Sequence, residues 1–300
     1  MRITPVITHA EPANRSTDMQ KLHKRVDDIS GEKRILDYLR SNMGLSHTLI
    51  KRVKYGGVFL NGTEVHMRAT VKPGDEITVI LSKGEKNEIR PIDIPLEILY
   101  EDESILAVSK PPEMPTHPSR GNSLPTLAEA VLSYLGEDAV FRAITRLDRD
   151  TSGIVLIAKD AFSASRLSAD LKAGRFEKKY IAITEGIPKE KSGRIEAPIK
   201  REAEDSIKRI VAADGKPAVT LYRIIDEIDG DKAIIELNLI TGRTHQIRVH
   251  LSHIGHPLVN DFLYGKRGDS TYMLHCSSLS FPHPLTGEMV LITSKPPFLK

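Results

Sequence analysis

Four charged side chains stand within five residues, directly before an apolar run, in the segment RLDRDTSGIVLIAK at residues 146–159. Its DTSG part is typical of a turn, because short polar side chains there bond to their own backbone and a glycine follows. The run GIVLIAK is rich in β-branched residues and predicts a strand. Asp148 is therefore expected at the rim of the core, where a carboxylate needs a cationic partner. A charged surface loop before a strand is the plainer interpretation.

A second segment, TGRTHQIRVHLSHIGHP at residues 241–257, combines arginines and histidines with helical spacing. The pattern predicts a helix that opens at Thr244, ends at Gly255 and turns three apolar side chains inward, namely Ile247, Leu251 and Ile254. Arg243 and Arg248 lie near the beginning of this helix, where the helix dipole is positive. The segment thus offers cations to a carboxylate elsewhere in the chain.

Four histidines in this segment and one cysteine beyond it allow two further kinds of site. We expect no metal site, because the spacing spreads the histidines around the helix and no cysteine or carboxylate pair stands nearby; the histidines are His245, His250, His253 and His256. Cys276 follows a histidine in LHCSSLSF and could be a thiol nucleophile. A small buried residue is the expected role.

The composition is that of an ordinary globular protein of about two domains. The 300-residue chain is 40% apolar and 28% charged, and its net charge of +3 is too small to indicate a partner. No run of about 18 apolar residues is present, so we expect no membrane span, and the first residues have no apolar core of a secretion signal. The single cysteine excludes an internal disulfide framework and fits the reducing cytosol.

We expect four parts along the chain: a loose leader at residues 1–18, a small α/β unit at 19–82, a charged linker at 83–96 and a large domain at 97–300. In the large domain, short β-branched runs bounded by turns outnumber helical patterns and do not alternate regularly with them. This favours an α+β fold with a mixed, mostly antiparallel sheet and flanking helices over a doubly wound fold.

The small unit carries most of the unbalanced charge. Two short helical patterns precede VFLNGTEV, which predicts a β-hairpin because Asn61-Gly62 supplies the positive φ values of a two-residue turn. Between residues 33 and 81 there are eight Lys or Arg against four Asp or Glu, a formal charge of +4. Three of the cations form what we call the basic cluster: Lys51, Arg52 and Lys54. The cluster is either a solvated helix face or a phosphate-binding face.

Taken together, these motifs resemble known families. The small unit, with its helix–helix–hairpin order, GGVFLNG turn and VKPGDEITV ending, looks like the alpha-L RNA-binding domain first described in a small-subunit ribosomal protein. Roughly residues 97–300 resemble the RluA/RluD-type pseudouridine synthases, in which an alpha-L unit is a common attachment. The motifs of this resemblance are RLDRDTSGIVLIAK, KKYIAI, TGRTHQIRVHLSHIGHPLVNDFLYG and LHCSSLSFPHPLTGE.

The resemblance implies roles for individual residues. Asp148 matches the catalytic aspartate of that family, and Tyr180, in KKYIA, matches the tyrosine that stacks on the target base. Arg248 matches the basic residue that pairs with the catalytic carboxylate. Arg146 matches the arginine implicated in taking the uridine out of its helix. The family usually has a histidine before RLD, where this chain has Thr145.

Further substrate contacts are expected around this set. The segment 115–122, with His117, is predicted to be an exposed loop and resembles the RNA-contacting loop of the family; a plain surface loop is the alternative. Thr151 and Arg243 are expected beside the substrate, and the basic cluster is expected to contact RNA phosphates.

The implied chemistry explains why such residues would be needed. Pseudouridine formation breaks the bond from ribose to a uracil nitrogen, turns the ring and rejoins it through ring carbon five, so no redox cofactor is required. It requires a poorly solvated carboxylate that acts as nucleophile or base at the sugar, and an adjacent guanidinium favours the charged form of that carboxylate. Unstacking the base costs a few kcal/mol, of which an aromatic platform recovers about 1–3 kcal/mol. Tyr180 suits that role, and its hydroxyl could move the proton from ring carbon five.

The sequence therefore predicts an RNA pseudouridine synthase that isomerises specific uridines in structured RNA, with ribosomal RNA expected ahead of transfer RNA. We expect a cytoplasmic monomer that uses neither a metal nor a cofactor. Two alternatives stay open: a non-catalytic RNA-binding or ribosome-assembly factor, and a histidine-ligated metallohydrolase. Whether the small unit supplies specificity or only affinity is also open.

Overall fold

The computed structural model of the chain describes residues 20–45, 47–81, 89–119, 123–136, 138–266, 268 and 270–299. The chain forms two compact units, Met1–Glu85 and Lys86–Lys300. The leader expected at residues 1–18 lies outside the described residues, as does part of the linker expected at 83–96. The predicted domain limits therefore stay predictions.

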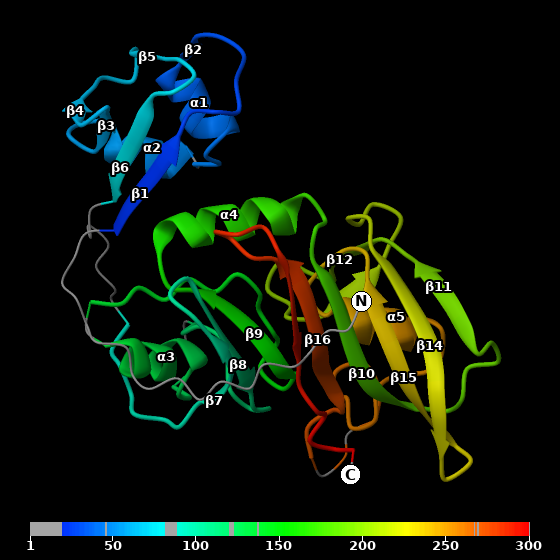
Figure 1. Cartoon of the computed structure of the whole chain (residues 1–300). Coiled ribbons are helices and arrows are strands. Elements are labelled where there is room, and N and C mark those ends of the chain that lie inside the picture. Colours follow the sequence, from blue (N-terminus) through cyan, green and yellow to red (C-terminus); the bar gives the residue numbers. More distant parts are fainter. Residues whose placement is uncertain are drawn as a thin grey trace. The chain divides into compact units, whose positions relative to one another are not determined.

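The first unit combines a small sheet with two short helices (Figure 1). Its four-stranded sheet has the order β1-β6-β3-β4, made of Gln20–Arg25 (β1), Glu76–Leu81 (β6), Val58–Leu60 (β3) and Thr63–Glu64 (β4). The helices are Ile35–Ser41 (α1) and His47–Val53 (α2), and a short ladder joins Lys33–Arg34 (β2) to Thr70–Val71 (β5). The expected hairpin is confirmed, with φ values of 50° at Asn61 and 81° at Gly62.

The sequence does not predict β1. This strand pairs antiparallel with β6 along its whole length, from Gln20 opposite Leu81 to Arg25 opposite Glu76. In QKLHKR only Leu22 is apolar. Because β1 is the edge strand of its sheet, it needs few buried side chains and leaves almost no hydrophobic pattern in the sequence.

The second unit is built on a nine-stranded sheet with the order β11-β14-β15-β10-β16-β9-β8-β7, to which β17 adds by pairing with β16. The strands are Glu97–Glu101 (β7), Ile105–Lys110 (β8), Ser152–Ala158 (β9), Glu177–Glu185 (β10), Ser192–Glu196 (β11), Val219–Ile228 (β14), Lys232–Leu239 (β15), Leu274–Pro282 (β16) and Met289–Thr293 (β17). A separate hairpin joins Ile199–Arg201 (β12) to Arg209–Val211 (β13). Only the β9–β16 pairing is parallel among the described strands, so the predicted mixed, mostly antiparallel α+β fold is confirmed.

Three helices belong to this unit: Leu127–Leu135 (α3), Ala161–Lys172 (α4) and Gln246–His253 (α5). Helix α3 begins with a capping box, in which the backbone N–H of Thr126 donates to Glu129 at 2.6 Å. Helix α4 packs on β9 and β16, and α5 packs on β13 and β14. None of the helices in the described ranges has both the length and the apolar character needed to cross a membrane.

The parallel pairing at the centre of the sheet fixes the end of the DTSG turn. Gly153 of β9 lies opposite Cys276 of β16, and Tyr180 of β10 lies opposite Cys276 on the other side. Gly153 has a φ of 109°, and a Cβ atom there would lie 2.6 Å from the backbone nitrogen of Cys276. Only glycine fits this close approach. The chain that carries Asp148 therefore enters the sheet two strands away from Tyr180.

Candidate active site

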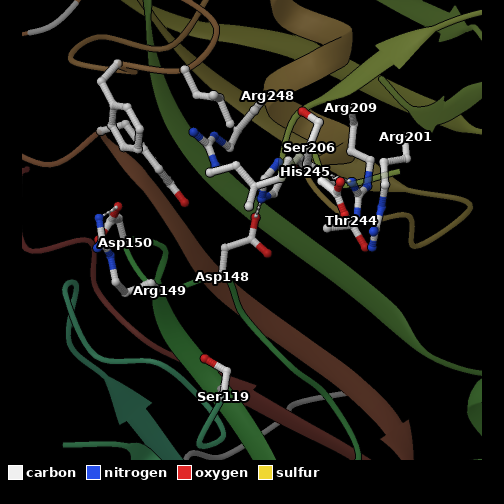
Figure 2. Close-up of a pocket in the computed structure, with 15 residues that line it drawn as sticks. Ser119, Asp148, Arg149, Asp150, Arg201, Ser206, Arg209, Thr244, His245 and Arg248 are labelled. Atoms are coloured by element: carbon white, nitrogen blue, oxygen red, sulfur yellow. Dashed lines mark hydrogen bonds and ion pairs between the residues drawn. The ribbon is translucent and has the colours of Figure 1, made fainter. Parts of the chain in front are cut away.

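Asp148 lies in the loop that leads into β9. Its neighbours Arg149 and Asp150 pair with each other: Nε and Nη2 of Arg149 donate to the two carboxylate oxygens of Asp150 at 2.7 and 2.9 Å. The side chain of Asp150 is buried, whereas that of Asp148 is 33% exposed. One carboxylate of the segment is thus neutralised within the loop, and the other faces a pocket (Figure 2).

Two pockets share Asp148. A recess of about 80 Å³ is lined by six of the residues that the sequence singles out: Arg146, Asp148, Thr151, Tyr180, Arg243 and Arg248. A larger pocket of about 500 Å³, in the size range of ligand sites, is also lined by Asp148, His245 and Arg248. The structure therefore brings together residues from the loop before β9, from β10 and from the start of α5.

The sequence predicts an ion pair between Arg248 and Asp148, but Arg248 pairs with Asp261 instead. Nε and Nη2 of Arg248 donate to Asp261, each at 2.7 Å, and the two side chains are 5% and 0% exposed. Asp261 also accepts the backbone N–H groups of Leu263 and Tyr264, at 3.1 and 3.2 Å. Asp261 is the only carboxylate that forms an ion pair with Arg248 among the described residues, so Arg248 acts on Asp148 as a nearby positive charge.

Two tyrosine rings hold the guanidinium of Arg248 in place. Its central carbon lies 4.3 Å from the ring centre of Tyr272 and 4.9 Å from that of Tyr264. Burial alone would lower the pKa of Arg248, but its hydrogen bonds to Asp261 and the nearby charges, that of Asp148 among them, raise the pKa above the ordinary value. The site thus contains a fixed and permanently charged cation.

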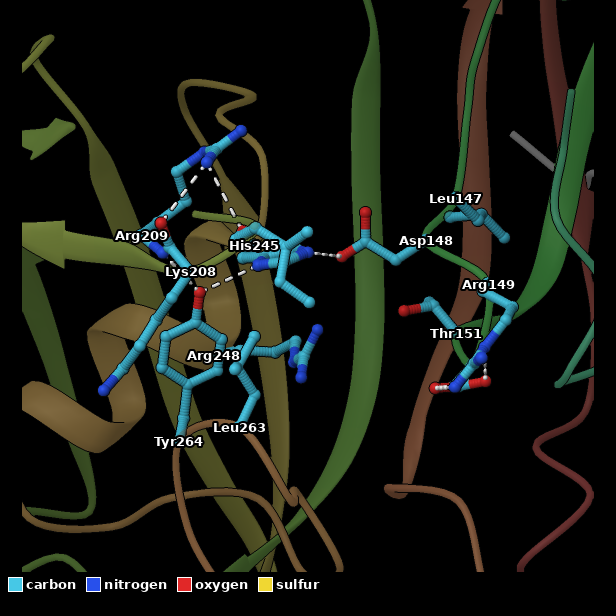
Figure 3. Close-up of polar contacts among 12 residues, drawn as sticks. Leu147, Asp148, Arg149, Thr151, Lys208, Arg209, His245, Arg248, Leu263 and Tyr264 are labelled. Atoms are coloured by element: carbon cyan, nitrogen blue, oxygen red, sulfur yellow. Dashed lines mark hydrogen bonds and ion pairs between the residues drawn. The ribbon is translucent and has the colours of Figure 1, made fainter. Parts of the chain in front are cut away.

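His245 is the side chain that faces Asp148 directly, and the sequence offers it only as a metal ligand. Its Nε2 lies 3.9 Å from Asp148, while its Nδ1 is 2.8 Å from the hydroxyl of Tyr264 (Figure 3). That hydroxyl also accepts the backbone N–H of Arg209 at 2.8 Å, so it fixes the ring of His245 to the β12–β13 hairpin. Burial, opposed by Asp148 and assisted by Arg248, lowers the pKa of His245. A neutral imidazole therefore faces the carboxylate through its Nε2.

The sequence predicts that helix α5 begins at Thr244, but in the structure it begins at Gln246. His245 has a φ of 58°, in the left-handed region, so the helix cannot include it. The buried Gln246 side chain takes over the turn, since its Oε1 accepts from the N–H of Arg243 at 2.9 Å and from the Thr241 hydroxyl at 2.8 Å. The late start is what frees His245 to point at Asp148.

Tyr180 lies in the recess with 7% of its surface exposed. Burial and the neighbouring Cys276 raise the pKa of Tyr180 well above its ordinary value, so the hydroxyl is protonated at neutral pH. Cys276 is the small buried residue that the sequence predicts, and burial raises the pKa of its thiol to about 12. A thiolate nucleophile at Cys276 is therefore not supported.

Lys110 supports the loop that carries Asp148, and none of the sequence motifs includes it. It is fully buried at the end of β8, and its Nζ donates to the carbonyl oxygens of Pro111, Met114 and Arg149 at 2.7, 2.8 and 2.9 Å. Burial lowers the pKa of Lys110 to about 7, although the charges of Asp150 and Asp148 oppose this shift. The only signal in the sequence is a lysine at the end of an apolar strand, in ILAVSKP.

The segment predicted as an exposed loop is tied to the active-site loop. Thr116 is buried, and its hydroxyl donates to the carbonyl oxygen of Leu147 at 2.8 Å. His117 is half-buried and packs edge-on against Phe141, with ring centres 4.9 Å apart. Residues 120–122 lie outside the described residues. His117 lines neither of the two pockets, so its expected contact with substrate stays a prediction.

Thr145, which stands where a histidine is usual, has a role in the backbone. It is buried, and its hydroxyl accepts the backbone N–H of Leu156 at 2.9 Å. The side chain therefore ties the segment before Asp148 to the middle of β9. A threonine in this orientation supports the loop without lining either pocket.

The basic cluster belongs to the first unit. Lys51 and Arg52 lie in the last turn of α2 and are exposed, and Nζ of Lys54 lies 5.0 Å from the ring centre of Tyr55. The ring of Tyr55 is itself 79% exposed. Exposed cations beside an exposed aromatic ring fit nucleic-acid binding, and this role stays a prediction.

The other three histidines of residues 241–257 line neither of the pockets that contain Asp148. His250 is buried, with Nδ1 2.9 Å from the Thr220 hydroxyl and Nε2 2.9 Å from the carbonyl oxygen of Ala197. His253 and His256 line a different pocket. Within the described residues, no group of three or more His, Cys, Asp or Glu side chains could hold a metal ion. The geometry gives the metallohydrolase alternative no support.

Comparison with known proteins defines the class. The RNA pseudouridylate synthase family model matches residues 104–253. The uncharacterized RNA pseudouridine synthase YjbO of Bacillus subtilis is 39% identical over 254 residues, which are 82% of this chain and 89% of that protein. The ribosomal large subunit pseudouridine synthase D of Pasteurella multocida is 35% identical over 292 residues, 91% of this chain and 87% of that protein. The solved structure of human RNA pseudouridylate synthase domain containing 1 is 28% identical, with a TM-score of 0.58, and covers 68% of this chain and 85% of its own.

The fold and these matches describe an enzyme that modifies RNA by isomerisation. The chain belongs to the RNA pseudouridine synthase family. The resemblance predicted from the four motifs is confirmed, and the interpretation as a non-catalytic RNA-binding factor is set aside.

Proposed function

We propose that this enzyme converts specific uridines of ribosomal RNA to pseudouridine and that Asp148 is its catalytic carboxylate. One observation carries the proposal. Three of the described residues line the recess and the larger pocket alike, namely Asp148, His245 and Arg248, and Asp148 is the only carboxylate among these three. The other acidic side chain of the loop, Asp150, is already taken up by Arg149. Asp148 therefore remains available to a substrate.

The surroundings of Asp148 suit a reaction in which charge moves between a sugar and a base. Asp148 acts on the ribose of the bound uridine, as nucleophile or as base, while the bond from ribose to the uracil nitrogen breaks. The ring turns, ring carbon five bonds to the sugar and gives up its proton, and the freed ring nitrogen ends with a proton, so the product is an isomer of the substrate. Arg248 supplies a positive charge that two rings and Asp261 hold in place, and a fixed charge needs no reorganisation during the reaction.

Tyr180 is proposed as the stacking platform for the uracil. The recess places its ring beside Asp148, with apolar walls from Leu147, Ile247 and Leu274. Stacking on an aromatic ring recovers about 1–3 kcal/mol of the cost of unstacking the base. Since burial raises the pKa of Tyr180, its hydroxyl holds its own proton at neutral pH and does not start the reaction as a base.

The other recess residues are proposed to hold the RNA around the flipped nucleotide. Arg146 is proposed to fill the space that the uridine leaves, and Thr151 and Arg243 to contact the nucleotide itself. Thr151 is oriented by a hydrogen bond to Tyr272 at 3.0 Å. Arg243 is oriented by its Nε, which donates to the carbonyl oxygen of Pro217 at 3.0 Å.

Ribosomal RNA is proposed as the substrate because two of the similar proteins are named ribosomal large subunit pseudouridine synthase D. We infer a monomer in the cytoplasm, where ribosomal RNA is processed. Mapping pseudouridines in the RNA of cells with and without this protein identifies the target. A site lost from transfer RNA alone would replace ribosomal RNA in the proposal.

The test of Asp148 is tritium release from RNA that carries ring-labelled uridine. Asp148→Asn is expected to fold and bind RNA while losing conversion by at least 10³-fold, because the amide is neither a nucleophile nor a base. Asp229→Asn, in the exposed β14–β15 turn, removes a carboxylate at a distance from both pockets and serves as the matched control. Normal conversion by Asp148→Asn would exclude Asp148 as the catalytic group.

A further inference from the structure

The larger pocket has a wall that the isomerisation of a single uridine does not use. Besides Asp148, His245 and Arg248, it is lined by part of the β12–β13 hairpin and by Phe262 from the loop after α5. The target uracil is proposed to bind in the recess beside Tyr180, so the proposed reaction gives this second wall no role.

Two large apolar side chains are exposed on this wall. Phe262 is 51% exposed and Ile207 is 68% exposed, and both line the same pocket. Phe262 does not extend from a loose loop, because Asp261 accepts the backbone N–H groups of Leu263 and Tyr264. The residue that holds Arg248 therefore also holds the turn that presents the Phe262 ring.

The same wall brings two guanidiniums together. Arg201 and Arg209 lie directly opposite each other in the β12–β13 ladder, and both line the pocket (Figure 2). Like charges opposite each other on two strands are destabilising. Neither forms an ion pair within the described part of the chain: Arg201 donates to the carbonyl oxygen of Glu204 at 2.6 Å, and Arg209 donates to three backbone carbonyl oxygens of its own turn. An anionic ligand would relieve their repulsion.

The hairpin is anchored to the active site. The backbone N–H of Arg209 donates to the hydroxyl of Tyr264 at 2.8 Å, and the same hydroxyl lies 2.8 Å from His245 (Figure 3). A ligand bound by the hairpin would therefore have a fixed position relative to His245, the side chain that faces Asp148.

We propose that this wall is a subsite for one nucleotide next to the target uridine, with the Phe262 ring stacking on its base and with Arg201 and Arg209 binding its phosphate. The assignment rests on the proposed function, because it takes the RNA to enter the recess through the shared pocket. A ring for the base and paired cations for the phosphate are the two components of single-stranded nucleic-acid sites. Because every base has a face that can stack, Phe262 would add affinity for the neighbouring nucleotide with little dependence on which base it carries.

The test measures binding and does not depend on turnover. The probes are nine-residue RNAs in which the central residue is uridine and all others are abasic, alone or with one adenine added on the 5′ or the 3′ side of the uridine. Fluorescence anisotropy gives the dissociation constants. For the wild-type protein, the adenine on one side is expected to tighten binding by about 5- to 150-fold, the range of one base–ring stack.

Phe262→Ala is expected to abolish this gain while leaving the affinity for the probe with uridine alone unchanged. Phe262→Tyr keeps a ring and is expected to keep the gain, which separates stacking from folding defects. Leu285→Ala, at an apolar side chain that is 52% exposed in the β16–β17 turn, is the matched control. If neither adenine improves binding to the wild-type protein, or if Phe262→Ala keeps the gain, the subsite is excluded. Tritium release by the wild-type protein tests the proposed function separately.

Discussion

The buried pair of Arg248 and Asp261 allows a sharp test of how the active site is held together. In Asp261→Asn the guanidinium stays buried and loses its counter-charge, although the amide oxygen can still accept the backbone N–H groups that Asp261 accepts now. Breaking a buried ion pair by changing one partner costs about 3–5 kcal/mol. Because part of the hydrogen bonding survives, we expect a loss of about 3 kcal/mol in the free energy of unfolding of the second unit.

Activity should fall for a related reason. The charge of Asp148 already contributes to the raised pKa of Arg248. When residue 261 is neutral, Asp148 is the carboxylate left for Arg248 to pair with. The freed guanidinium is drawn toward Asp148 and neutralises the group that the reaction needs. We therefore expect kcat to drop at least tenfold, which corresponds to about 1.4 kcal/mol in the activation free energy.

Amide hydrogen exchange measures the stability part of this prediction within one sample, because it reports each strand separately. Protection in β14 and β15 should fall by about 3 kcal/mol, while β1 and β6 of the first unit stay unchanged. Glu196→Gln is the matched control, since it breaks an exposed pair with Arg194, and such pairs contribute about 0–1 kcal/mol. The double variant Arg248→Gln/Asp261→Asn should recover part of the stability. A loss below about 1 kcal/mol in Asp261→Asn would refute the reasoning.

Three further predictions concern single features. Burial lowers the pKa of His245 below that of an ordinary histidine, so the neutral form is present at neutral pH and is lost only at more acidic pH; kcat should decline there, and His245→Gln should remove that part of the decline. Gly153→Ala should destabilise the second unit by about 2–4 kcal/mol in urea unfolding, because the added methyl group meets the backbone of the neighbouring strand. Replacing the three cations of the basic cluster by glutamines should make the salt dependence of RNA binding shallower. The negative slope of the logarithm of the binding constant against the logarithm of the salt concentration should decrease in magnitude by about 2, if each cation contacts a phosphate.

Each of these has an outcome that contradicts it. An unchanged acid limb in His245→Gln would show that another group controls the decline. Native stability of Gly153→Ala would mean that the parallel strand pair can move apart. For the basic cluster, the control is the same number of glutamines at exposed cations elsewhere in the first unit: Lys21, Arg25 and Lys72. Equal slopes in the two triple variants would remove any special role for the cluster.

Much of this protein follows from the sequence alone. Turn chemistry at DTSG and at Asn61-Gly62, the β-branched runs and the helical spacing of residues 246–253 are local features, and the structure has a turn, strands or a helix at each. The predominance of short strands determines the mixed, mostly antiparallel sheet. Asp148 stands out because local sequence places a charged group against an apolar strand.

Only the tertiary structure decided which charges pair. Arg149 and Asp150 neutralise each other, Asp261 takes Arg248, and Asp148 is left facing His245. Sequence cannot predict this, because an ion pair depends on distances of a few ångströms between segments far apart in the chain, and electrostatic energy changes steeply over such distances. The edge strand β1, the late start of α5 and the buried Lys110 were missed for a similar reason: each is stabilised by hydrogen bonds to other parts of the chain and leaves little local pattern.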